Sequence, residues 1–177
     1  MEYLLGFTAL LLILSFLLKC SFLPRLWVAV FSVLMGTAVL LAIPWITRQS
    51  QAGFEAWVSS PNLMLDAAVC IVLEVVLMTV FCFSRPSGRL RRLAFYPGLP
   101  AIPAACAVWG RVLFSYPGLN FTRFAWIAAL ATVAIVYAAC RLIRRLVPEE
   151  DIRLESLFIV NLFLLLMTVA TTGAITF

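Results

Sequence analysis

The sequence predicts an all-α protein: a polytopic membrane helix bundle with six transmembrane helices, forming a single domain over residues 1–177. Composition is the first reason, because 64% of the residues are hydrophobic, 12% are charged and the mean hydropathy is +1.09. A soluble domain is about half apolar and about a quarter charged. The second reason is pattern, since the apolar residues fall into six segments near the roughly 20 residues that a spanning helix needs.

The six predicted spans follow one another from end to end of the chain. They cover residues 3–18, 26–46, 63–84, 101–115, 121–140 and 154–176. The first span has Glu2 before it and Lys19 after it. A signal peptide carries its positive charge before the apolar core, so we expect this segment to be retained as a span.

Basic residues gather in alternate connections between these spans. Ten of the thirteen lysine and arginine residues fall in the first, third and fifth connections. Cytoplasmic loops are enriched in Lys and Arg, so these connections are predicted to be cytoplasmic and both termini external. The expected location is a cell membrane of the bacterial inner-membrane type. The ten residues are Lys19, Arg25, Arg85, Arg89, Arg91, Arg92, Arg141, Arg144, Arg145 and Arg153.

Signals for helix ends agree with this division. Ser60-Pro61 is typical of an N-cap followed by a proline at the first helical position. Pro24 is expected to begin the second span in the same way, and Glu150 and Asp151 are acids suited to a first turn. Residues 48–62 are predicted either as a short interfacial helix or as a solvated loop, and the sequence leaves both open.

The fourth span, residues 101–115, is short and interrupted by proline. Tyr-Pro-Gly-Leu occurs at both of its ends, at 96–99 and 116–119, and Pro-Gly suits the centre of a type II turn. Pro100 and Pro103 shorten the helix further. We expect some non-helical backbone within residues 95–103 at membrane depth, where protein must cover it. Two interpretations follow: a broken helix that lines a site, or a short helix between two tight turns, which we favour.

Asp66 lies near the start of the third span and is expected to form an ion pair. At 1.5 Å per residue it lies about 5 Å below the outer edge of the membrane. Arg111, on a span running outward, and Arg123, at the start of the fifth span, are expected near the same edge. A carboxylate beside an arginine keeps its charge at low cost. Asp66 with Arg111 or Arg123 is therefore the candidate ion pair.

Glu74 lies deeper in the same span, about 16 Å below the outer edge at 1.5 Å per residue. A carboxylate at that depth is costly, so it is paired, protonated or used in function. Its expected partners are hydroxyls and amides: Thr132 on the fifth span, and Asn161, Thr168 and Thr172 on the sixth. Glu74, Asn161 and Thr168 are the candidate proton-handling residues. The alternative, weighed equally, is a protonated glutamate that bonds across helices as structural glue.

Small residues and cysteines complete the pattern. The fifth span is rich in alanine and the second contains Ser32-x-x-x-Gly36, and small residues four apart let helices approach closely. The partner of these faces is this chain or another. The five cysteines form no C-x-x-C and the sequence has no histidine, so we expect packing cysteines and neither a metal site nor a cofactor.

These observations predict a non-catalytic integral subunit of a larger cytoplasmic-membrane complex, of a kind coupled to the proton motive force. No histidine, redox cysteine pair or metal constellation indicates an enzyme. The expected partners are the lipid bilayer and other integral membrane subunits, with no nucleic acid, because the basic residues lie beside apolar segments. The alternative is a small solute or ion transporter or channel with Glu74 at its site.

Overall fold

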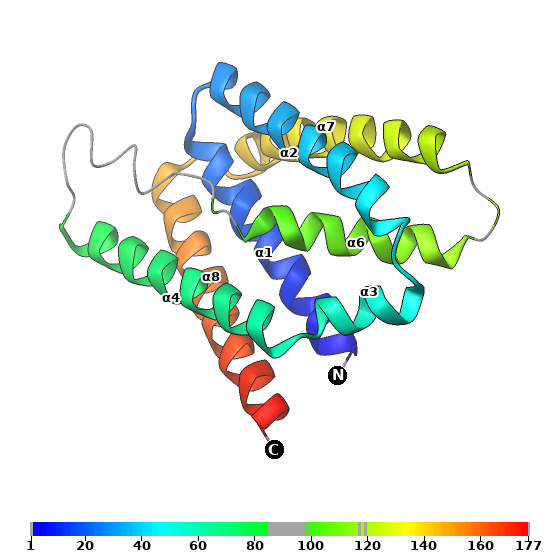
Figure 1. Cartoon of the computed structure of the whole chain (residues 1–177). Coiled ribbons are helices and arrows are strands. Elements are labelled where there is room, and N and C mark those ends of the chain that lie inside the picture. Colours follow the sequence, from blue (N-terminus) through cyan, green and yellow to red (C-terminus); the bar gives the residue numbers. More distant parts are fainter. Residues whose placement is uncertain (1, 85–97, 99, 117, 119, 177) are drawn as a thin grey trace.

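The computed structural model describes residues 2–84, 98, 100–116, 118 and 120–176, and within them the chain folds as seven helices with no strand (Figure 1). The predicted all-α class is confirmed. Six of the helices correspond to the six predicted apolar segments, and α3 lies between the second and third. The helices are α1 (Glu2–Phe22), α2 (Arg25–Ile46), α3 (Gln51–Val58), α4 (Pro61–Ser84), α6 (Ala101–Ser115), α7 (Phe121–Leu146) and α8 (Glu150–Thr176).

Among the residues that the structure describes, three helices are long and apolar enough to cross a membrane: Arg25–Ile46, Phe121–Leu146 and Glu150–Ala170. Shorter apolar helices are formed by Gly6–Phe22 and Ala101–Ser115, the two segments that the sequence also marks as short. A membrane location is compatible with these helices, and the count of six spans stays a prediction.

The helix ends follow the capping signals closely. α4 begins at Pro61, and Glu150 and Asp151 occupy the first turn of α8 as predicted, whereas Pro24 precedes α2 as its N-cap residue. Residues 51–58 adopt the helical alternative, and Ser50 caps α3 by accepting a hydrogen bond at 3.1 Å from the backbone N–H of Gly53. This capping satisfies one of the N–H groups that a helix start leaves without a partner.

α1, α4 and α8 form one packed group, in which α1 and α4 run in the same direction and α8 runs against both. Two apolar layers, separated by about two helical turns, establish these directions. Residue numbers rise along α1 and α4 from the first layer to the second and fall along α8. The first layer is Leu11, Ile71 and Leu164, and the second is Leu18, Met78 and Leu157.

α2 and α7 form a second close pair, and α6 packs against α1 and α2. Gly36 allows the close approach, because a Cβ at this position would lie 3.0 Å from the carbonyl oxygen of Ala129 and would overlap Val133. The small residues of α2 and of one face of α7 therefore pack within this chain. α3 is anchored on α6 by Phe54, whose buried ring covers Gly110.

Two arginines tie together the ends of α1, α7 and α8. Arg144 donates from Nε to the carbonyl of Ser21 at 2.7 Å and from Nη2 to the carbonyl of Leu23, and Arg153 donates to Ser21 at 3.0 Å. Cations and donors at a helix C-terminus satisfy its free carbonyls. The first and fifth connections thus lie at one end of the bundle, as predicted, and both termini lie at the other end (Figure 1). The third connection, with Arg85, Arg89, Arg91 and Arg92, lies outside the described residues.

Candidate functional site

The centre of the α1–α4–α8 group holds an ion pair between Lys19 and Glu74. Lys19 Nζ lies 2.6 Å from Glu74 Oε2, Lys19 is 2% exposed and the Glu74 side chain is 19% exposed. This corrects two expectations, because Lys19 was predicted in the first connection and Glu74 was expected to contact hydroxyls and amides. The physical reason is that α1 continues to Phe22, because Cys20 and Phe22 each pack in an apolar cluster and Lys19 between them is therefore part of the helix.

Lys19 and Glu74 belong to a polar layer, which we define as Ser15, Lys19, Glu74 and Asn161. Ser15 lies one turn before Lys19 on α1, and its Oγ donates to Asn161 Oδ1 at 2.8 Å. Ser15, Glu74 and Asn161 lie between the two apolar layers along their helices, and the Lys19 side chain reaches Glu74 from one residue beyond Leu18. The Nδ2 group of Asn161 is buried and has no hydrogen-bond partner among the described residues. Such a layer penalises any shift of register, because a shift would set charges against apolar side chains.

The backbone of Gly98 packs against the side chain of Glu74. The approach is so close that a Cβ at Gly98 would overlap the Glu74 carboxylate. Gly98 lies outside the helices, so non-helical backbone reaches the level of Glu74, whereas residues 101–103 of the predicted non-helical stretch belong to α6. Gly118 has the positive φ, 96°, that the second predicted type II turn requires, whereas Gly98 does not. Residues 96, 97, 99, 117 and 119 of the two tetrapeptides lie outside the described residues.

Two other predicted partners of Glu74, Thr132 and Thr168, are engaged elsewhere, and the side chain of Thr172 lies outside the described residues. Thr132 accepts a hydrogen bond at 2.8 Å from Trp109 Nε1, and its own hydroxyl donates to the carbonyl of Ala128. Thr168 is buried two turns along α8 from Asn161, and its hydroxyl donates to the carbonyl of Leu164 at 2.7 Å. Among the three candidate residues, the structure thus places Glu74 and Asn161 in one layer and Thr168 outside it. A role for any of them in proton handling stays a prediction.

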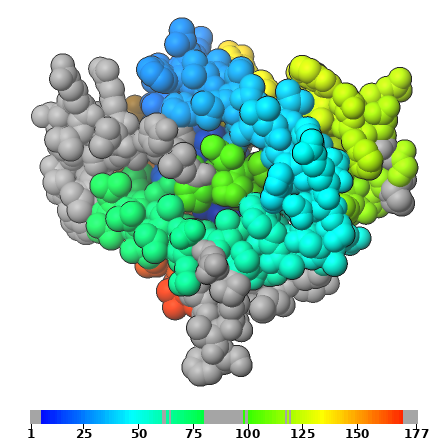
Figure 2. Space-filling model, in the orientation of Figure 1, coloured from blue at the N-terminus to red at the C-terminus, as the bar shows by residue number. Residues whose placement is uncertain are grey.

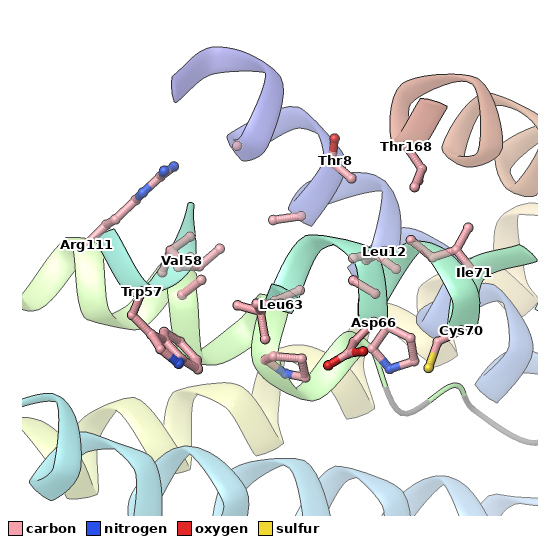
Figure 3. A pocket seen from close by; sticks show the side chains of 18 residues that line it. Thr8, Leu12, Trp57, Val58, Leu63, Asp66, Cys70, Ile71, Arg111 and Thr168 are labelled. Atoms are coloured by element: carbon pink, nitrogen blue, oxygen red, sulfur yellow. The ribbon is translucent and has the colours of Figure 1, made fainter. Parts of the chain in front are cut away.

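A cavity of about 280 Å³ lies between α1, α3, α4 and α6. Asp66 and Arg111 both line it, at different places (Figure 3). In the described part of the chain, the structure forms no ion pair between Asp66 and either Arg111 or Arg123. Arg123 is exposed at the start of α7 and is not part of the cavity wall. The predicted ion pair of Asp66 is therefore not formed here and stays a prediction.

Sequence reasoning missed Lys19 and Ser15, although the spacing of four residues between them was a usable signal. Both would occupy one face of a helix if the first span were continued by one turn. The buried cysteines Cys20, Cys106 and Cys140 pack among apolar side chains, as predicted. No group of three or more metal-binding side chains occurs within the residues that the structure describes.

In its described residues the chain is thus all-helical, with three helices long and apolar enough to cross a membrane and a largely buried ion pair between Lys19 and Glu74. No protein-family model, curated protein or solved structure matches this chain.

Proposed function

We propose that the chain is a non-catalytic integral subunit of a larger membrane complex, with six spans and both termini on the external side. The observation that carries the proposal is the outward face of α7. At about 100° per residue, Ala134 faces away from Thr132 and Val136, which are buried in the bundle. Ala134 and Ala138 are exposed. Small residues four apart on an outer helix face suit close packing against a helix of another subunit.

The polar layer supports a structural role over a transport role. The Lys19 ammonium compensates the charge of Glu74 at 2.6 Å, and Lys19 is almost fully buried. A carboxylate held in such a pair keeps its charge and links two helices. Coupling of the complex to the proton motive force remains a hypothesis from the sequence, and the pair gives Glu74 a sufficient role without it.

A second candidate function, transport of a small solute or ion, is supported by the cavity. Its wall combines apolar side chains with the charged groups of Asp66 and Arg111. Ligand sites typically combine an apolar lining with a few polar groups in this way. Transport would require the cavity to open alternately to both sides of the membrane.

The subunit proposal predicts that a bulky side chain on the outer face of α7 prevents assembly without unfolding the chain. We expect Ala134→Phe to lower the amount of co-purifying integral membrane partner about tenfold, since overpacking costs about 1–3 kcal/mol. The measurement is the partner-to-chain ratio after extraction in mild detergent and size-exclusion chromatography.

Ile135→Phe is the matched control, because Ile135 is exposed on the same helix about 100° away from Ala134. We expect it to leave the partner ratio unchanged. A wild-type chain that migrates without any stoichiometric partner and binds a solute would contradict the subunit proposal and favour transport.

A further inference from the structure

The cavity between α1, α3, α4 and α6 combines apolar walls with one half-buried guanidinium. Apolar side chains from all four helices line it, including Leu12, Val58, Ile71 and Ala104. The surface of α6 is recessed between α2, α3 and α4 in the space-filling view (Figure 2). Helix α4 packs mainly on α8 rather than on α6. The cavity lies between α4 and α6, and both helices contribute residues to its wall.

Arg111 lies at the edge of this cavity, next to the N-terminal part of α1. Its Nη1 lies 3.6 Å from the position that a Cβ on Gly6 would occupy, so the absence of a side chain at Gly6 leaves this part of the guanidinium uncovered. Among the described residues, Arg111 has no hydrogen bond or ion pair from its side chain, although Asp66 lines the same cavity. A half-buried cation in apolar surroundings favours a bound anion.

We propose that this cavity binds a phospholipid, with the lipid phosphate on Arg111 and part of one acyl chain between α4 and α6. The proposal rests on the membrane location of the proposed function, which supplies phospholipids at the protein surface. A guanidinium is well suited to phosphate, which it can bind through two parallel hydrogen bonds. The volume, about 280 Å³, lies near the lower limit of roughly 300–1,000 Å³ for ligand pockets. It suits a segment of an acyl chain and leaves the head group outside.

The test uses the full chain, delipidated in maltoside micelles, and a phosphatidylglycerol with a photoactivatable diazirine in its acyl chain. After illumination, mass spectrometry locates the lipid adducts along the chain. We expect adducts on the cavity residues of α4 and α6. Arg111→Gln should lower their yield about tenfold, as expected for the loss of a hydrogen bond to a charged group. Arg123→Gln is the matched control, because this exposed arginine lies outside the cavity wall, and it should label like the wild type.

Two further comparisons identify the ligand chemistry. A photoactivatable diacylglycerol with the same acyl chain lacks the phosphate and should label the cavity about tenfold less. Ala67→Phe, which fills the cavity from α4, should remove the adducts while Arg111 is kept. Equal labelling by diacylglycerol, stronger labelling by a photoactivatable fatty acid, or adducts spread over the outer faces of α2 and α7 would each overturn the proposal.

Vesicle flotation of the wild-type chain separates this inference from the function on which it rests. A chain that does not float with the vesicles would contradict the membrane location itself. A chain that floats but gives no cavity adducts would contradict the lipid site alone.

Discussion

Lys19→Met is expected to destabilise the chain by about 3–5 kcal/mol, the usual cost of removing one partner from a buried ion pair. The reason is that Glu74, 19% exposed, would remain in apolar surroundings without its ammonium partner. Glu74→Met should cost a similar amount, because the Lys19 ammonium is then left unpaired at 2% exposure. Unfolding in mixed detergent micelles, titrated with a denaturing detergent, measures both changes.

The double variant Lys19→Met/Glu74→Met distinguishes a coupled pair from two independent contacts. Two methionines of similar length bury no charge, so we expect most of the lost stability to return. Arg123→Met, a change at an exposed arginine, is the control and should stay within about 0.5 kcal/mol of the wild type. Losses that simply add in the double variant would show that Lys19 and Glu74 do not interact.

Gly98→Ala is expected to displace the Glu74 carboxylate from Lys19 and to destabilise the chain by about 3 kcal/mol, near the cost of breaking a buried pair. The added Cβ would occupy the position of the carboxylate, and a well-packed interior has little room for it to move. The measurement is again unfolding in mixed micelles.

The cause of this loss can be checked by repeating Gly98→Ala in a chain that carries Lys19→Ala and Glu74→Ala. Without the carboxylate the three atoms closest to the new methyl group are gone, so the substitution should then change stability by less than about 1 kcal/mol. An equal loss in both backgrounds would place the effect in the backbone at Gly98 and would contradict the contact with Glu74.

The helices were largely predictable because their signals are local. Apolar segments of spanning length, Pro61 at a helix start and acids at the start of α8 each act within a few residues. The bounds of α6 agree with the predicted fourth segment. The predicted end of α1 was four residues short, because Lys19 was treated as a loop residue rather than as a cation that a helix carries into the bundle.

The polar layer was only partly predictable because it depends on which helices become neighbours. Glu74 and Asn161 stood out as polar residues in apolar segments, but their partners lie 55 and 146 residues away in the sequence. Thr132 was an equally good candidate by depth, yet it lies on α7, against Trp109. Depth along a span can be estimated from the helical rise, whereas the neighbour across the bundle follows from packing of all the helices.

The Lys19 contact also changes how a proton-handling role can be tested. Glu74→Gln keeps the shape of the side chain and most of its hydrogen bonding but cannot exchange a proton, so it is the natural test of proton handling. In the structure that single change would leave Lys19 charged and unpaired, so lost function would follow from lost stability as well. Lys19→Met/Glu74→Gln removes both charges together and avoids this ambiguity.

We propose that the polar layer holds three helices together and does not transfer protons. The most direct measurement compares the proton permeability of vesicles that contain the wild-type chain or Lys19→Met/Glu74→Gln, each with its co-purifying partners. An entrapped pH-sensitive dye reports the decay of an imposed pH gradient. We expect equal decay rates and equal partner ratios for the two proteins. A decay rate that falls in the double variant while its partners remain bound would contradict the claim and assign proton transfer to Glu74.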